Sequence, residues 1–375
     1  MPELLVVDAF DPFAEPLRVL HVWQPTEAGV PRYAWAAAQF QADHGWDVHV
    51  ACPNPTAHDR ISTHVWNSDR SPVKGVRREQ AALRRILDEV DPDLVVAHSA
   101  KAGLVVRLTV RGRIPTVYIP HAWPHLALPA AARPVAVGWE KFGSRWVDAI
   151  VAVGDGEAAE GEERGIAAPM YVVRNPVPAG WAPADEHARM AARRILDLPA
   201  GPIAVCVGRF SRQKGQDVLV EAWRAVRVEV PDATLVLVGD GPMLAEVRAA
   251  AGPGVLLPGS SSDPRPYLAA ADVAVLPSRW EGLSLSMLEA MASARSLVVT
   301  DVSGCEVVRE ARAGAVVATD NPAALAAALV PRLRGEIDAD AEGRRGADYV
   351  EVHHDFDTEM MRLALVERLV ADRDV

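Results

Sequence analysis

The sequence has few cysteines, and the three it has lie far apart. Cys52, Cys206 and Cys305 form no CxxC pair and show no Cys/His spacing typical of a zinc site. This pattern excludes a disulfide framework and a structural zinc site, and it favours a reducing compartment. Cys206 stands inside the apolar run IAVCVG, where we expect it to be a small core residue.

The sequence also lacks an excess of positive charge and any long apolar run. Its 39 basic and 50 acidic side chains give a net charge of −11, whereas a nucleic-acid-binding surface is basic. No segment approaches the roughly 18 consecutive apolar residues of a membrane span. The first twenty residues lack a basic stretch and contain Glu3, Asp8, Asp11 and Glu15, unlike a secretory signal. We therefore expect a soluble, cytoplasmic protein, and we assign no role to residues 1–16.

Short runs rich in Val, Ile and Leu recur along all 375 residues, half of which are hydrophobic. This length favours two domains, and continuous apolar runs are typical of parallel strands covered on both faces by helices. Amphipathic segments such as VRREQAALRRILDEV separate the runs. The alternation predicts an α/β fold with two doubly wound halves. The runs are LRVLHVW, DVHVACP, DLVVAHS, TVYIPHA, AIVAVG and MYVVRNP in the first half, and IAVCVG, ATLVLVG, GVLLPG, DVAVLP, SLVVT and GAVVAT in the second.

One segment interrupts the alternation. NPVPAGWAPADEHARM, residues 175–190, contains three prolines and a glycine. Such a composition is typical of a linker, so we place a domain boundary near residue 180. The chain closes with the amphipathic segment DFDTEMMRLALVERLVAD, which predicts a final helix.

Three basic residues follow a predicted strand of the second half. In open α/β sheets, ligands bind at the carboxyl ends of the strands. RFSRQKGQ comes directly after IAVCVG and contains Arg209, Arg212 and Lys214 ahead of a predicted helix. Cations beside a helix N-terminus form an anion site, although basic loops are often only solvated. From these residues alone both interpretations stay open.

Two glutamates flank a predicted helix start after the strand DVAVLP, in EGLSLSMLE. With a helix beginning near Gly282, the amides of residues 282–286 have no partner inside the helix, and Gly282 and Ser284 leave room for a ligand. Glu281 precedes the helix, and a carboxylate can accept two hydroxyls at once. Glu289 lies among apolar neighbours, where an acid needs a partner or a ligand. The alternative is a helix with a favourable first-turn charge and an ordinary surface acid.

The first half offers weaker candidates. Gly29 follows the strand LRVLHVW, where it marks either a simple turn or a close approach to a ligand. His98 and His121 each end a predicted strand, as structural residues or as ligand contacts. The sequence contains no HExxH, GxSxG or P-loop motif, and LVGDGP is not a dinucleotide fingerprint.

Taken together, four segments resemble a known family. VGRFSRQKGQDVLVEAW, LVLVGDGPM, YLAAADVAVLPSRWEGLSLSMLEAMA and VVTDVSGCEVV are similar, in order and spacing, to the retaining glycosyltransferases of sequence family 4. The N-terminal half matches through Gly29, HSAKAG and His121. The resemblance implies the GT-B fold, in which two Rossmann-like domains face each other across a cleft. It implies an acceptor-binding domain over residues 1–180, a donor-binding domain over 181–350, and a helix over 351–375 that crosses back to the first domain.

The resemblance also implies roles for individual residues. Arg209 and Lys214 match a basic pair that binds the diphosphate of a nucleotide sugar. Glu281 matches an acid at the donor sugar, and Glu289 an acid at the ribose. His121 matches a histidine near the reacting centre, and HSAKAG brings in His98 and Lys101 as acceptor-binding candidates beside Gly29. The implied catalytic residues are His121, Arg209, Lys214 and Glu281. The implied donor-binding residues are Gly29, Gly208, Arg209, Lys214, Glu281, Gly282, Leu283, Ser284, Leu285 and Glu289.

The sequence departs from the family pattern at three places. Ala28 precedes Gly29 where members often have two glycines, which puts the role of this loop in doubt. Asn175 is followed by Pro176 where many members have glycine, and Ala294 and Ser296 replace a usual Gly and Pro. None of these changes removes an expected catalytic side chain.

The implied reaction moves a sugar from a nucleoside diphosphate sugar to a hydroxyl of a glycan, a lipid-linked acceptor or a small molecule, with retention and without metal. No other cofactor is expected, a UDP-sugar is the favoured donor, and nucleic acid is not a partner. A nucleotide-sugar epimerase and a non-catalytic sugar-nucleotide-binding protein remain alternatives. Peripheral contact with an anionic membrane also stays open, because arginines cluster at Arg77, Arg78, Arg84 and Arg85 and at Arg107, Arg111 and Arg113.

Overall fold

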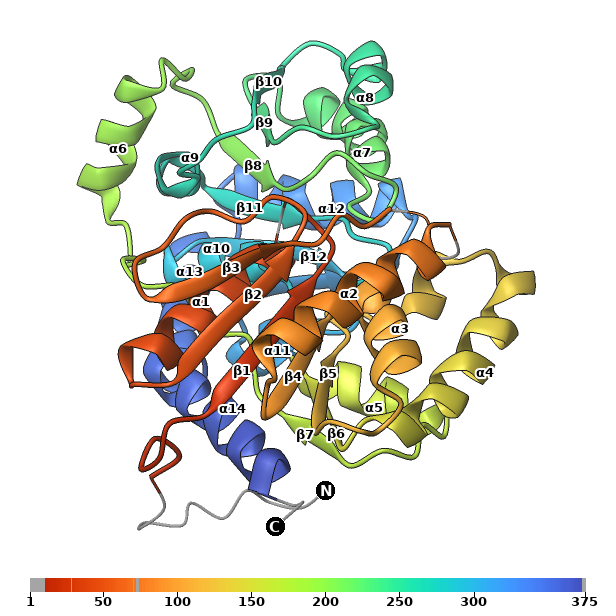
Figure 1. Cartoon of the computed structure of the whole chain (residues 1–375). Coiled ribbons are helices and arrows are strands. Elements are labelled where there is room, and N and C mark those ends of the chain that lie inside the picture. The colour runs from red at the N-terminus through yellow and green to blue at the C-terminus, as the bar shows by residue number, and fades with distance from the viewer. Residues whose placement is uncertain (1–10, 28, 70, 72–73, 373–375) are drawn as a thin grey trace. The chain divides into compact units, whose positions relative to one another are not determined.

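The computed structural model describes residues 11–27, 29–69, 71 and 74–372 and divides the chain into two compact units (Figure 1). The N-terminal unit comprises Met1–Asn175 with Asp357–Val375, and the C-terminal unit comprises Pro176–Phe356. The division therefore falls after Asn175 and Phe356, a few residues from the expected boundaries near 180 and 350. Part of the expected linker is helical, because α6 begins at Glu186.

The N-terminal unit is built on a parallel sheet of seven strands in the order β3-β2-β1-β4-β5-β6-β7. The strands are β1 Arg18–Trp23, β2 Asp47–Cys52, β3 Ile61–Val65, β4 Leu94–His98, β5 Thr116–Ile119, β6 Ala149–Ala152 and β7 Met170–Val172. The helices of this unit are α1 Gly29–Asp43, α2 Val76–Val90, α3 Ser99–Val110, α4 Arg133–Gly143, α5 Asp155–Glu163 and α14 Phe356–Ala371, with the 3-10 turns η1 Pro124–Ala127, η2 Ala130–Ala132 and η3 Ser144–Trp146.

The C-terminal unit repeats the arrangement with six parallel strands in the order β10-β9-β8-β11-β12-β13. The strands are β8 Ile203–Val207, β9 Thr234–Val238, β10 Val255–Gly259, β11 Val273–Leu276, β12 Ser296–Thr300 and β13 Gly314–Val317. The helices are α6 Glu186–Ile195, α7 Gln216–Glu229, α8 Leu244–Ala250, α9 Arg265–Ala270, α10 Leu285–Ala292, α11 Glu306–Ala311, α12 Pro322–Leu333 and α13 Ala339–His353. The predicted α/β fold with two doubly wound, Rossmann-like domains is confirmed.

All twelve predicted strands are present, but the sequence reading missed β3. Its sequence ISTHV contains three polar residues, and only Ile61 is fully buried. β3 is the edge strand of its sheet, where one side has no strand partner and an apolar run is not required. The buried central strands have the continuous apolar runs that predict a strand, and this edge strand lacks such a run.

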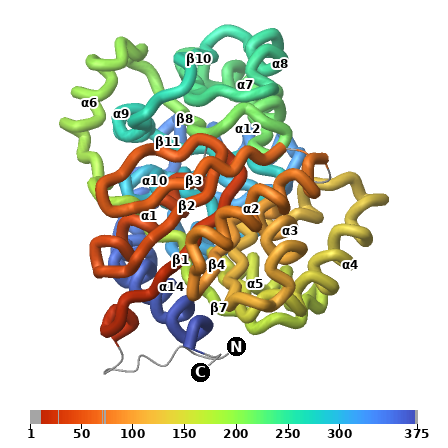
Figure 2. The backbone as a smooth tube through the Cα atoms, in the orientation of Figure 1, coloured from red at the N-terminus to blue at the C-terminus, as the bar shows by residue number. Residues whose placement is uncertain are grey.

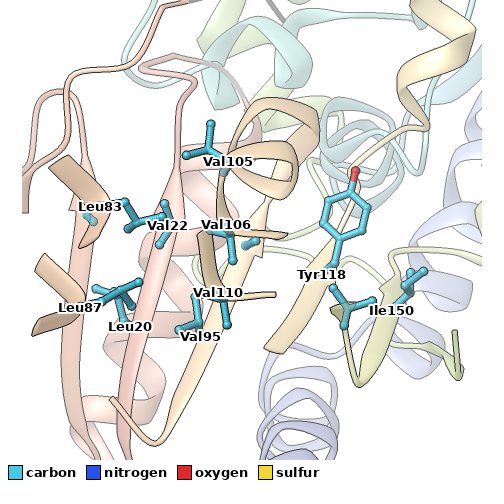
Figure 3. Close-up of a cluster of buried hydrophobic side chains, with 14 of the residues drawn as sticks. Leu20, Val22, Leu83, Leu87, Val95, Val105, Val106, Val110, Tyr118 and Ile150 are labelled. Carbon is cyan, nitrogen blue, oxygen red and sulfur yellow. The ribbon is translucent and has the colours of Figure 1, made fainter. Parts of the chain in front are cut away.

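Continuous apolar strands and the faces of α2 and α3 form the core of the N-terminal unit (Figure 3). Burying one such side chain contributes roughly 1.5–3 kcal/mol. The spacing of the apolar residues in VRREQAALRRILDEV places Leu83, Ile86 and Leu87 on the buried face of α2. Figure 3 shows the labelled core residues Leu20, Val22, Leu83, Leu87, Val95, Val105, Val106, Val110, Tyr118 and Ile150.

The final helix α14 follows the C-terminal unit in the chain but belongs to the N-terminal unit, as expected (Figure 2). Its buried Glu359 accepts a hydrogen bond from the amide of Arg174 at 2.8 Å. Its buried Arg368 donates to the carbonyl of Pro12 at 3.0 Å. None of the helices in the described residues combines the length and apolar character needed to span a bilayer.

Candidate functional site

Two neighbouring loops of the C-terminal unit carry most of the predicted donor-binding residues, whereas Gly29 lies in the N-terminal unit. β8 and β11 are adjacent in the sheet, so the loops that follow their carboxyl ends are neighbours too. Residues 208–215 connect β8 to α7, and residues 277–284 connect β11 to α10. The two predicted motifs thus meet at one edge of this sheet.

Lys214 and Glu281 form an ion pair at this edge. The Lys214 Nζ lies 2.5 Å from Glu281 Oε1, and both side chains are largely buried. The Ser278 hydroxyl donates to the same carboxylate oxygen at 2.7 Å, and the Gln213 side-chain amide donates to the carbonyl of Trp280 at 3.0 Å. The carboxylate is therefore held by a hydroxyl and an ammonium, with its charge compensated by Lys214.

A close backbone approach locks the two loops together. Gly215 has φ +66°, and a Cβ built on it would lie 2.1 Å from the carbonyl oxygen of Pro277. Only glycine combines this conformation with this proximity at low cost. The glycine in RFSRQKGQ is thus explained by packing of one loop on the other.

Arg279 holds the same two loops by hydrogen bonds. Its amide donates to the carbonyl of Gln213 at 2.7 Å, and its guanidinium donates to the carbonyl of Arg212 at 2.8 Å. It also forms a two-pronged contact with Asp217 at 2.7 and 2.9 Å. The hydrogen bond with Asp217 raises the pKa of Arg279, while for Asp217 these contacts outweigh burial and lower its pKa. Sequence reasoning missed Arg279, because nothing in SRW reveals a partner in another loop.

The helix after Glu281 begins later than predicted. The expectation of a start near Gly282 is wrong, because α10 begins at Leu285 with Ser284 as its N-cap residue. Ser284 has φ −73° and ψ 121°, which is extended backbone, and the carbonyl of Gly282 accepts a hydrogen bond from the Ser303 hydroxyl. Gly282 and Leu283 are both buried in the turn. The first helical amides are therefore those of Leu285 and Ser286.

Glu289 lies in the middle of α10 with 1% of its surface exposed, among buried apolar neighbours such as Leu288 and Met291. This placement agrees with the expectation that it is not an ordinary surface acid. The recess beside Glu281 is small, about 10 Å³, which is room for about one water molecule. A ligand as large as a nucleotide sugar would therefore extend beyond this recess.

Arg209 and Gly208 follow β8 directly, as predicted. Arg209 is half-buried, and its Nε is fully buried without a hydrogen-bond partner in the described part of the chain. The Gln216 side-chain amide donates to the carbonyl of Arg209 at 3.0 Å, and the amide of Gly208 donates to the carbonyl of Val238. The buried Nε–H of Arg209 is thus a donor that no described residue satisfies.

A larger hollow of about 740 Å³ lies at the opposite edge of this sheet, where Pro202 and Asp272 precede β8 and β11. The arginines that line it are engaged with acids. Arg193 contacts Asp272 at 2.8 Å, and Arg332 contacts Glu342 at 2.7 Å. We place the candidate site at the carboxyl edge, because ligands of open α/β sheets bind at the carboxyl ends of the strands.

In the N-terminal unit, His121 lies in a constrained turn after β5. His121 has φ 55° and Ala122 has φ 102°, both in the region that non-glycine residues rarely adopt. Buried Glu157 holds this turn, since its carboxylate accepts from the amide of Ala122 at 2.5 Å and from the amide of Val153 at 2.8 Å. Burial raises the pKa of Glu157 to about 7. Glu157 stands shortly after the strand AIVAVG, and this position near the carboxyl end of a strand could have identified it as a candidate site residue.

His98 lies behind His121 and is fully buried. Its Nδ1 lies 3.1 Å from His121 Nε2, and its Nε2 lies 3.0 Å from Nδ1 of His21 in β1. Burial lowers the pKa of His98 well below its ordinary value, that of His21 to about 4 and that of His121 to about 3. All three rings are therefore neutral at pH 7. His21 was not predicted, although a histidine inside the apolar strand RVLHVW is an unusual residue.

Lys101 lies in α3 and is committed to the protein. Its ammonium contacts Glu79 at 2.9 Å and donates to the carbonyls of Ser71 and Lys74 at 2.8 and 2.7 Å. One ion pair and two hydrogen bonds thus hold the ammonium within the protein. Gly29 is the first residue of α1, and the adjacent Ala28 lies outside the described residues.

One arginine of the predicted basic clusters does not reach the surface. Arg107 is fully buried, forms a two-pronged contact with Glu140 at 2.8 and 3.1 Å, and lies over the ring of Tyr118. Arg77, Arg78, Arg84 and Arg85 of α2 are exposed. Arg107 therefore contributes nothing to a basic face. Among the described residues, no group of three His, Cys, Asp or Glu side chains is placed to hold a metal ion.

Comparison with known proteins links both units to one group of enzymes. Residues 28–180 match the family described as Glycosyltransferase Family 4, and residues 201–334 match the family described as Glycosyl transferases group 1. The GDP-mannose-dependent alpha-(1-6)-phosphatidylinositol monomannoside mannosyltransferase of Mycobacterium tuberculosis is 33% identical over 195 residues, which are 48% of this chain and 51% of that protein. The chain thus spans about half the length of this curated relative.

Two further proteins match over longer stretches. The UDP-Gal:alpha-D-GlcNAc-diphosphoundecaprenol alpha-1,3-galactosyltransferase of Escherichia coli is 25% identical over 317 residues, covering 77% of this chain and 80% of that protein. The structure of Anabaena HepE in complex with UDP-glucose superimposes with a TM-score of 0.79 at 19% identity, covering 93% of this chain and 99% of that one. This likeness concerns the fold, which is GT-B. Since both units match in the order of the family, the chain belongs to the group 1 glycosyltransferases of family 4.

Proposed function

We propose that the chain is a retaining glycosyltransferase that moves a sugar from a nucleoside diphosphate sugar to an acceptor hydroxyl without a metal ion. The observation that carries this proposal is the placement of Lys214, Arg209 and Glu281 at one strand edge of the C-terminal unit. Two cations beside a carboxylate suit a ligand that has both phosphates and hydroxyls.

The proposed reaction breaks the bond between the anomeric carbon and the leaving phosphate oxygen. Negative charge grows on that oxygen, where Lys214 and Arg209 stabilise it. The acceptor oxygen bonds to the anomeric carbon on the same face, and its proton passes to the leaving diphosphate. No protein nucleophile is required. Glu281 accepts hydrogen bonds from hydroxyls of the sugar, and Glu289 accepts them from hydroxyls of the ribose. His121 approaches the sugar and the reacting centre.

The relatives support a nucleotide-sugar donor and a lipid-linked or glycan acceptor. One is named as a GDP-mannose-dependent phosphatidylinositol monomannoside mannosyltransferase, and another as a UDP-Gal:alpha-D-GlcNAc-diphosphoundecaprenol galactosyltransferase. HepE was solved with UDP-glucose. We therefore propose a role in glycolipid or polysaccharide synthesis, with a UDP-sugar as the first donor to test.

A thermal-shift screen of UDP-, GDP- and dTDP-sugars tests the donor. A ligand that binds only the folded protein at 100 times its Kd stabilises it by about 2.7 kcal/mol, so the preferred donor raises the melting temperature clearly. Transfer to a polyprenyl-diphosphate glycan is then followed by NMR, with and without EDTA. An inverted anomer contradicts retention, and loss of activity with EDTA contradicts metal independence. Isomerised donor without acceptor identifies an epimerase instead.

A further inference from the structure

Five buried or half-buried side chains of the N-terminal unit form one unbroken series of hydrogen bonds, which we call the histidine chain. It runs through Glu367, Gln41, His21, His98 and His121. The donor–acceptor distances along it are 2.6, 2.7, 3.0 and 3.1 Å. The members come from α14, α1, β1, β4 and the turn after β5, so the final helix and the catalytic candidate His121 are its two ends.

The hydrogen bonds of the histidine chain all run in one direction. A neutral imidazole carries one proton, so a ring that uses both nitrogens donates from one and accepts at the other. The Gln41 amide donates to Glu367 Oε2, which leaves Gln41 Oε1 to accept from Nε2–H of His21. His21 Nδ1 then accepts from Nε2–H of His98, and His98 Nδ1 accepts from Nε2–H of His121. Each ring therefore bears its proton on Nε2.

We propose that Glu367, Gln41, His21 and His98 are positioning residues that hold His121 in the tautomer with its proton on Nε2 and a lone pair on Nδ1. His121 is half-buried, and its one hydrogen bond in the described part of the chain goes to His98. Its Nδ1 is thus left to accept a hydrogen bond from a ligand hydroxyl. This deepens the proposed function, on which the use of His121 in transfer rests.

The far end of the histidine chain fixes its direction, because the Gln41 amide nitrogen donates to Glu367 Oε2. Burial raises the pKa of Glu367 well above its ordinary value, which favours a neutral carboxyl whose carbonyl oxygen still accepts this hydrogen bond. A methionine at position 367 offers no such oxygen, so it would hold Gln41 in neither orientation. Turning Gln41 over reverses every donor in the histidine chain and moves the His121 proton to Nδ1. A substitution in α14 is therefore expected to alter a ring in the turn after β5.

The test is a long-range 1H–15N correlation spectrum of the full chain labelled with 15N-histidine, which distinguishes protonated from unprotonated ring nitrogens. His121→Gln identifies the His121 signals by their loss. In the wild type we expect His121 with its proton on Nε2. In Glu367→Met we expect about half of the molecules to carry it on Nδ1, since Gln41 loses the acceptor that holds its amide and both directions become comparable. Gln41→Met provides a second variant with the same expectation.

The protein offers a matched control in two further histidines that contact each other. His49 Nδ1 lies 3.1 Å from His64 Nε2 on β2 and β3, outside the histidine chain. His64→Gln should leave the His121 tautomer and the transfer rate unchanged. A His121 proton on Nδ1 in the wild type overturns the proposal, and so does a tautomer that stays the same in both Glu367→Met and Gln41→Met.

The kinetic readout separates this proposal from the proposed function. With half of His121 in the wrong tautomer, kcat should fall about twofold while the KM for the donor stays unchanged. A purely structural role would instead lower stability without moving the tautomer, which overturns the proposal. If the tautomer shifts but kcat does not, the positioning role stands and the part of the proposed function that uses His121 is wrong.

Discussion

Lys214 Nζ lies 2.5 Å from Glu281 Oε1, although the two residues are 67 positions apart in the sequence. The family resemblance assigns them to different parts of a nucleotide sugar, the diphosphate and the sugar. The ion pair means that a bound diphosphate would compete with Glu281 for the ammonium, freeing the carboxylate to accept sugar hydroxyls. Donor binding and the preparation of Glu281 would then be one event.

Lys214→Ala should lower kcat roughly 10²- to 10³-fold, because a cation that stabilises the leaving diphosphate is lost. The measurement is steady-state transfer with the preferred donor, together with a thermal melt to show that the variant is folded. Arg224→Ala provides the control, since Arg224 is an exposed arginine on α7 with the same loss of one charge. A folded Lys214→Ala enzyme with full turnover would remove Lys214 from the diphosphate site.

Glu289→Gln should weaken donor binding roughly tenfold or more while changing kcat little. A charge-assisted hydrogen bond contributes about 1.5–3 kcal/mol, and a ribose contact is present in both the ground state and the transition state. Isothermal titration with the nucleoside diphosphate measures the binding, and Glu246→Gln, at an exposed position of α8, is the control. Unchanged affinity in Glu289→Gln would leave Glu289 a structural residue of α10.

Gly215→Ala should destabilise the C-terminal unit and lower transfer. An added Cβ meets the Pro277 carbonyl at 2.1 Å, and φ +66° is unfavourable for alanine, so the two loops must separate. We expect a loss of about 1–3 kcal/mol in the free energy of unfolding, measured by urea denaturation. Gly252→Ala is the matched control, because a Cβ there meets nothing within 4 Å. Equal stability of the two variants would contradict the locked loops.

The sequence predicted what depends on neighbours in the chain, and it failed where the partner lies far away. Apolar runs identified the central strands, and the helix spacing placed α2 at its observed bounds. The edge strand β3 gave no apolar signal, and the start of α10 depends on how the turn at Gly282 packs against Ser303. Pairing of Gln41 with Glu367, 326 positions apart, cannot be read from spacing, because only the fold brings α1 and α14 together.

The position of a motif residue also did not reveal whether its side chain is free. Lys101 stands in HSAKAG as an acceptor candidate, yet its ammonium has three partners in the protein. Arg209 stands in a basic loop of equal appearance, yet its buried Nε–H has no hydrogen-bond partner among the residues that the structure describes. Charge and position suggested both residues equally, and the hydrogen-bond partners distinguish them.

Glu157 should make stability depend on pH in a direction opposite to that of most acids. Burial raises the pKa of its carboxyl group to about 7 in the folded chain, against 4.5 as its ordinary value. The folded state therefore binds the proton more tightly, and the free energy of unfolding falls as pH rises from 4.5 to 7. The expected loss from this group is about 3 kcal/mol.

The buried histidines act in the reverse direction over an overlapping range, since burial lowers the pKa of His21 to about 4 and that of His121 to about 3. The contribution of Glu157 therefore has to be measured as a difference. Urea denaturation of the wild type and Glu157→Gln at pH 4.5 to 7.5 gives that difference, and exposed Glu163→Gln on the same helix is the control. Replacing Glu157 removes its titration, so the wild type should lose stability relative to Glu157→Gln as pH rises. If the two curves stay parallel, Glu157 is ionised without cost and the turn at His121 is held by a permanent carboxylate.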